Sequence, residues 1–86
     1  MNQENQEPAS RLPRGARADA ESPEAIYLIK HASSLRATYQ IRLLALKAVE
    51  SGKDLVLMVP RTCRFDPSLE ALCLGTSGTI RREDLP

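Results

Sequence analysis

The sequence predicts a small α/β domain in which three strands alternate with two helices, behind a disordered N-terminal tail. Two short apolar runs, residues 25–29 and 55–59, have the length and composition of buried strands. Between them, residues 34–51 are mostly apolar with a narrow polar stripe, which predicts a helix long enough to connect two parallel strands. We therefore expect a minimal β-α-β-α-β sandwich whose three-stranded sheet is at least partly parallel.

The predicted tail covers residues 1–22, and residues 23–86 are predicted to form one domain. The tail holds six apolar residues, four of them alanine, and it includes Pro8, Pro13 and Gly15, whereas residues 23–86 hold thirty apolar residues. Only the longer stretch can bury enough apolar surface to offset the entropy lost on ordering the chain. A domain this small leaves much of its surface wet, and pairing of two copies would hide more of it.

The first strand, residues 25–29, has an alternative interpretation. Ser22-Pro23 is a favourable start for a helix, and a helix here would give a mainly α fold. At 100° per residue, however, the four apolar residues from Ile26 to Ile29 point in four directions and leave no polar face. The strand is the favoured prediction.

The helix over residues 34–51 is the most clearly marked element. Ser33 and Ser34 can cap its beginning, and Gly52 can end it. Arg36, Gln40, Lys47 and Glu50 fall on one narrow arc, with Arg42 as an exception among apolar neighbours, so most of the circumference is apolar. We expect this helix to be covered on more than one side, and the domain to associate with itself or with another protein.

The remaining elements follow from local signals. Residues 55–59 are bounded by Gly52 and Pro60, as expected of a central strand, and we expect both of its faces to be covered. Asp66 and Pro67 are typical of a helix cap and a first helical position, and Gly75 can end that helix. Residues 79–83 are predicted to be a short edge strand protected by its charges.

One candidate site follows from this topology. The carboxyl ends of two parallel strands lie at the same edge of a sheet, so residues 31–34 and 60–64 should lie side by side. The first segment leads into a helix N-terminus, which attracts anions. The predicted anion-binding residues are Ser33, Ser34, Arg36, Arg61 and Thr62. The alternative, which is commoner in proteins, is that the serines cap the helix and the arginines keep a loop soluble.

Cys63 is a candidate reactive thiol, because Arg61 and Arg64 lie beside it in the sequence and would favour the thiolate. A nucleophile also needs a positioned acid or base, and His31 is the only histidine. The spacing matches no catalytic pattern, so an unreactive thiol is the favoured interpretation. The sequence contains no recognised catalytic motif, phosphate-binding loop or metal-ligand spacing, and it indicates no cofactor.

The function predicted from these observations is that of a non-catalytic interaction or accessory domain that associates with itself. The alternatives are a domain that binds a small anion or phosphate ester and, less favoured, a weak nucleic-acid binder, since the net charge is +1 and Arg42 points away from Arg36 and Lys47 on the predicted helix. The chain has no apolar run long enough to span a membrane, and its first residues are polar. We therefore expect a cytoplasmic protein without a membrane partner.

Overall fold

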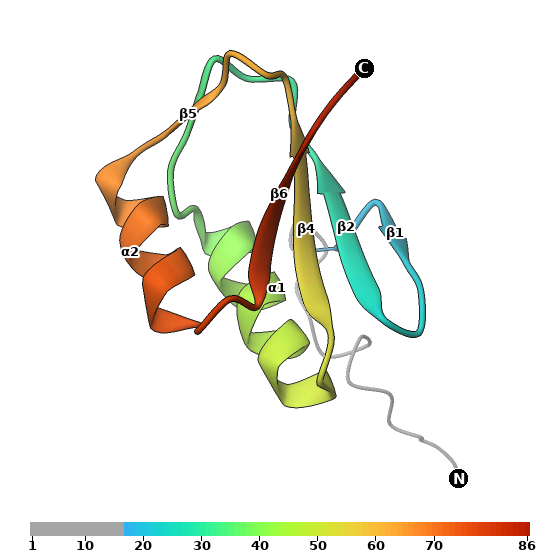
Figure 1. Ribbon diagram of the computed structural model, residues 1–86. Coiled ribbons are helices and arrows are strands. Elements are labelled where there is room, and N and C mark those ends of the chain that lie inside the picture. The colour runs from blue at the N-terminus through green and yellow to red at the C-terminus, as the bar shows by residue number, and fades with distance from the viewer. Residues whose placement is uncertain (1–16) are drawn as a thin grey trace, which may run out of the picture.

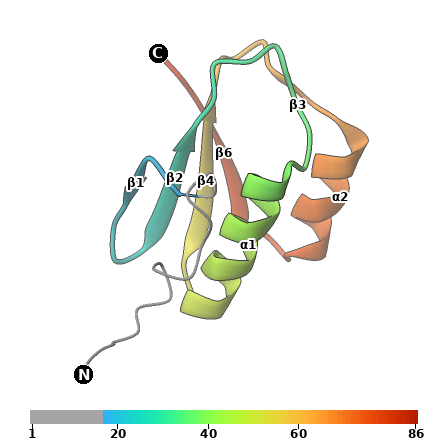
Figure 2. The ribbon, with the colours of Figure 1, turned by 180° about the vertical axis from the view of Figure 1, so that it is seen from behind.

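The computed structural model describes residues 17–86, which form a sheet with two helices on one of its faces (Figures 1 and 2). In chain order the elements are β1 (Ala20–Glu21), β2 (Ala25–Ile29), β3 (Ser34–Leu35), α1 (Tyr39–Ser51), β4 (Asp54–Val59), β5 (Arg64–Phe65), α2 (Pro67–Gly75) and β6 (Ile80–Asp84). The predicted α/β class is confirmed, and the first of the three predicted strands is a strand rather than a helix. No helix in the described part of the chain is long and apolar enough to cross a membrane.

The main sheet has four strands in the order β1-β2-β4-β6, one more than the three predicted, because residues 20–21 add the strand β1. β2, β4 and β6 are parallel to one another, with Leu28 opposite Leu57 and Leu57 opposite Arg82, whereas β1 pairs with β2 in the antiparallel direction. The predicted parallel pairing of the first two strands is therefore present as β2 and β4, the structure adds a second parallel pair, β4 and β6, and β6 is the predicted edge strand.

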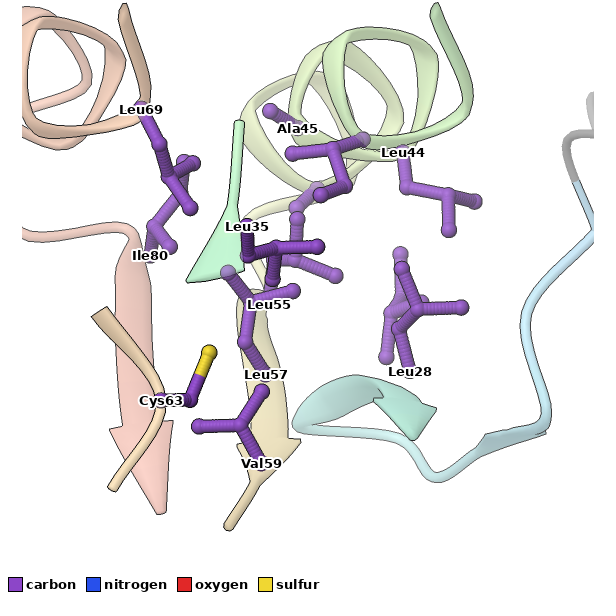
Figure 3. Close-up of a cluster of buried hydrophobic side chains, with 13 residues drawn as sticks. Leu28, Leu35, Leu44, Ala45, Leu55, Leu57, Val59, Cys63, Leu69 and Ile80 are labelled. Carbon is purple, nitrogen blue, oxygen red and sulfur yellow. The ribbon is translucent and has the colours of Figure 1, made fainter. Parts of the chain in front are cut away.

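Both helices lie on the same face of the sheet because the chain steps in one direction across it, from β2 to β4 and then to β6 (Figures 1 and 2). Successive right-handed crossovers in one direction place their helices on one face. The helices bury alternate residues of the strands, and Leu55, Leu57 and Val59 of β4 are each fully buried there. They belong to one core cluster with Leu44 of α1 and Leu69 of α2, and Figure 3 shows Leu69 beside Ile80 of β6 and Leu44 beside Leu28 of β2.

The opposite face of the sheet is covered differently from what we expected of the central strand. Within residues 17–86 no helix lies over it (Figure 2). Val56 is nevertheless only 2 % exposed, and its neighbours in register are Tyr27 of β2 and Arg81 of β6. We attribute its burial to these flanking side chains, whereas Met58 on the same face is half-buried.

The predicted beginning of the first helix is wrong. α1 starts at Tyr39 rather than near residue 34, and its cap is Thr38, whose hydroxyl oxygen accepts a hydrogen bond from the Ile41 N–H at 3.2 Å. Gly52 ends the helix as predicted, in the left-handed conformation (φ 69°) that favours glycine. α2 begins as predicted, with Asp66 as its cap and Pro67 in its first turn.

The two segments that lead into the helices form a second, smaller sheet of two strands, which is not part of the predicted fold. β3 pairs with β5 in the parallel direction, with Ser34 opposite Arg64 and Leu35 opposite Phe65. In Figure 1 these connections run side by side beyond the ends of the main strands. Because Leu35 belongs to this pairing and is buried, the chain stays extended here instead of beginning α1.

The structure also moves the boundary of the predicted tail. Residues 20 and 21, which we assigned to the tail, form β1 and pair with Tyr27 and Ile26 of β2. Ala18 packs against the core as well. The ordered unit therefore begins before residue 23, and residues 1–16 of the predicted tail lie outside the described residues.

Candidate functional site

The predicted meeting of residues 31–34 with residues 60–64 is confirmed at the carboxyl edge of the sheet. The Arg64 N–H donates to the Ser33 carbonyl at 2.9 Å, and the Asp66 N–H donates to the Leu35 carbonyl at 2.8 Å. Ser33 and Ser34, however, are not the cap of α1, which begins after Thr38. The candidate anion site therefore loses the helix N-terminus that we expected immediately beside its two serines.

Four of the five candidate anion-binding residues are divided between two pockets formed by residues 17–86. Ser34 and Arg36 line a shallow pocket of about 480 Å³ between β3 and β5, together with Thr38, Arg64, Phe65 and Asp66. Arg61 and Thr62 line a pocket of about 580 Å³ at the ends of β4 and β6, together with His31, Asp84 and Leu85. Ser33 contributes its backbone carbonyl to the pairing of β3 with β5.

A carboxylate lies in each pocket and opposes the binding of an anion. Asp66 lies in the first pocket, where hydrogen bonds from Ser68 and, to a smaller extent, the charge of Arg36 hold its pKa below the ordinary value. Asp84 lies in the second pocket, and its Oδ1 is 3.3 Å from Nε of Arg82. The predicted cluster of arginines is therefore divided between two pockets, and a carboxylate in each pocket offsets part of its positive charge.

Arg82, which no local sequence pattern marks as functional, holds this edge of the molecule together. Its terminal nitrogens donate to the carbonyls of Cys63 at 2.8 Å, Arg61 at 3.0 Å and Pro60 at 3.2 Å. The planar guanidinium can span several acceptors, which a lysine cannot do. Arg82 thus fixes the turn between β4 and β5 to the edge strand, as a structural rather than a ligand-binding residue.

Cys63, the candidate reactive thiol, lies in the hydrophobic core (Figure 3) and is 4 % exposed. Its Sγ is 3.8 Å from the Arg64 carbonyl oxygen. This placement favours a packing role over attack on a substrate, because reactive cysteines are partly exposed. Among residues 17–86 no group of three histidine, cysteine, aspartate or glutamate side chains is arranged to hold a metal ion.

The outer face of α1, which we define as Tyr39, Arg42, Leu46, Val49 and Glu50, is the main exposed apolar surface on a helix. α1 buries its opposite side, with Ile41, Leu44, Ala45 and Ala48 in the core. On the outer face Tyr39 is 66 % exposed, Leu46 53 % and Val49 51 %. The expectation that α1 is covered on more than one side is thus not met by residues 17–86, which leave this apolar stripe exposed.

The charged residues of the outer face are placed symmetrically about Leu46. Arg42 lies one turn before Leu46 and Glu50 one turn after it, so all three residues fall on one side of the helix. The Nε of Arg42 donates to the Ala37 carbonyl at 3.0 Å, which holds this side chain near the beginning of α1. The outer face therefore has a positive end, an apolar centre and a negative end.

The sequence matches no family model, and comparisons with curated proteins and with solved structures found no similar chain.

Proposed function

We propose that this protein is a non-catalytic interaction domain that pairs with a second copy of itself through the outer face of α1. The observation that carries the proposal is the symmetric pattern of Arg42, Leu46 and Glu50 on an exposed apolar stripe. Large side chains such as leucine and valine lose unfavourable contact with water when such a stripe is covered.

A twofold axis through Leu46 makes this face complementary to itself. If two copies of α1 pack in antiparallel orientation about that axis, Arg42 of each copy lies opposite Glu50 of the other. The same axis brings Leu46 onto its own counterpart, and it brings Leu43, a half-buried residue of α1 outside the defined outer face, opposite Val49. Such an isologous contact uses one patch on both copies, as closed dimers require. The antiparallel orientation also places the positive end of each helix dipole near the negative end of the other.

Charge reversal tests this geometry directly. We expect Arg42→Glu alone and Glu50→Arg alone to weaken the dimer, because each change places like charges opposite each other twice. The double variant should restore association, since it reverses both members of every pair. Both changes favour the helix dipole, so the single variants are not expected to unfold α1. The measurement is sedimentation equilibrium at tens of micromolar protein.

Leu46→Glu provides a stronger disruption at the centre of the contact, and Leu74→Glu provides its matched control. Leu74 is 83 % exposed on α2, outside the outer face of α1. Leu46→Glu should give a monomer, whereas Leu74→Glu should leave the mass unchanged. A wild-type chain that is monomeric at these concentrations would contradict the proposal, and so would a double charge reversal that fails to restore the dimer.

A further inference from the structure

The outer edge of β2 is closed by a very short piece of the same chain. β2 is an apolar strand, Ala25–Ile29, and β1 covers it with only two paired residues, both exposed. Two backbone hydrogen bonds flank this pairing: the Asp19 N–H donates to the Tyr27 carbonyl at 2.9 Å, and the Ser22 N–H donates to the Ala25 carbonyl at 2.8 Å. A strand so short is among the parts of a fold that open at low cost in free energy.

Immediately before β1, a side-chain carboxylate takes the place of a backbone carbonyl as the hydrogen-bond acceptor for β2. Oδ2 of Asp19 accepts a hydrogen bond from the Ile29 N–H at 2.7 Å, so a side chain satisfies a donor that a longer strand would pair with its carbonyl. Charge-assisted bonds of this kind are stronger than those between neutral groups. The edge of β2 thus accepts an extended segment together with a carboxylate beside Ile29.

A second carboxylate of the same segment is held by two lysines. Oε1 of Glu21 lies 2.9 Å from Nζ of Lys47 on α1, and its Oε2 bonds to Nζ of Lys53 in the turn before β4. The lysine side chains are only 12 % and 19 % exposed, whereas the Glu21 side chain is 35 % exposed. The lysines belong to the body of the domain, and their shared counter-ion is supplied by the short covering strand.

We propose that the edge of β2, with Lys47 and Lys53 beside it, is a binding site for an acidic extended segment of another protein. The segment adds to the sheet as an antiparallel strand and carries two carboxylates separated by one residue, as Asp19 and Glu21 do here. Residues 19–21 of this chain occupy the site as an exchangeable cover. Backbone hydrogen bonds supply part of the affinity, and the lysines select for acidic side chains. The site lies outside the outer face of α1 and does not depend on pairing through it.

The test uses a labelled peptide that copies residues 17–22, added to the full-length chain. The receptor is the double variant Asp19→Asn with Glu21→Gln, in which the covering segment loses both carboxylates. In the wild type the tethered segment competes at high effective concentration, so the peptide binds weakly. We expect the double variant to bind the peptide at least tenfold more tightly. Binding should weaken as salt is raised, because these ion pairs are partly exposed.

Two controls test whether binding depends on the carboxylates of the peptide and on Lys47 and Lys53. A peptide with asparagine and glutamine in place of its two acids should bind the double variant at least tenfold more weakly. Adding Lys47→Gln and Lys53→Gln to the double variant should remove the preference for the acidic peptide. Equal binding of the two peptides, or no binding of either, would overturn the proposal. If the double variant does not fold, the wild type is titrated with millimolar acidic peptide instead, and we expect shifts of the backbone amide signals of Tyr27 and Ile29. The absence of these shifts would also overturn the proposal.

Discussion

The guanidinium of Arg82 lies over the ring of Phe65, 5.0 Å from its centroid, and so joins the edge strand β6 to β5. The same side chain donates to three carbonyls of residues 60–63. Hydrogen bonds from a charged group contribute more than neutral ones, and the contact with the ring adds to them. We expect Arg82→Ala to lower the free energy of unfolding by about 2–3 kcal/mol, measured by urea denaturation.

The neighbouring Arg81 is the control for this prediction. Its side chain is 55 % exposed and pairs with Asp54 and Glu83 on the other face of the sheet. Exposed ion pairs contribute little, so Arg81→Ala should change the free energy of unfolding by less than about 1 kcal/mol. Arg82→Lys should recover little of the stability lost in Arg82→Ala, because one ammonium group cannot donate to all three carbonyls at once. Equal losses for Arg81→Ala and Arg82→Ala would contradict the role given to Arg82.

The strands β2, β4 and β6 could be predicted from local sequence, whereas the short strands β1, β3 and β5, the beginning of α1 and the role of Arg82 could not. The runs that include Ile26 and Leu57 are apolar at successive positions, as in strands buried in a parallel sheet. Ser34 satisfies the sequence rule for a helix cap, but Leu35 pairs with Phe65, a residue thirty positions away. The three carbonyls that hold Arg82 lie about twenty residues before it. Pairings over such separations leave no local pattern to detect.

The candidate anion site shows the same limit. The sequence predicted correctly that residues 31–34 and 60–64 meet, because that follows from a parallel crossover. It could not indicate that Asp66 and Asp84 would stand in the two pockets. It also could not show that both helices lie on the same face of the sheet. In open α/β sheets a ligand crevice forms where successive crossovers go to opposite faces, and the crossovers of β2, β4 and β6 do not do so.

The corrected beginning of α1 gives a prediction about capping. Thr38 accepts a hydrogen bond from the Ile41 N–H, so Thr38→Ala should lower the free energy of unfolding by about 1 kcal/mol. Ser34 is exposed in β3, and Ser34→Ala should change that free energy by less than about 0.5 kcal/mol. Both variants can be compared by thermal or urea unfolding. A larger loss for Ser34→Ala than for Thr38→Ala would favour the earlier start that the sequence suggested.

The two faces of β4 should differ in their sensitivity to substitution. Leu57 is fully buried beneath the helices, and Leu57→Ala should lower the free energy of unfolding by about 2–5 kcal/mol. Met58 is half-buried on the face without a helix, so Met58→Ala should cost only about 1 kcal/mol. Urea denaturation of both variants measures the difference. Equal losses would indicate that the second face is covered as fully as the first.

Glu21 makes the stability of the domain depend on pH in a defined direction. Its hydrogen bonds to Lys53 and then to Lys47 hold the pKa of this carboxyl below its ordinary value of 4.5. The folded state therefore prefers the ionised form, and the contribution of Glu21 is fully present above the unfolded pKa. It is lost as the pH falls through the lower folded pKa, because protonation removes the charge that the two lysines hold.

Glu21→Gln isolates this contribution from that of the other carboxyl groups, including Asp66, whose pKa is also lowered. At neutral pH the variant should be less stable than the wild type. The difference in the free energy of unfolding should shrink as the pH is lowered from about 5. Protonation of Glu21 in the wild type then removes the ion pairs with Lys47 and Lys53, which the variant already lacks. High salt at neutral pH should also reduce the difference, because the Glu21 carboxylate is partly exposed. Urea unfolding of both chains across this range provides the measurement. A difference that stays constant or grows toward acid would show that the ion pairs of Glu21 do not stabilise β1 on the sheet.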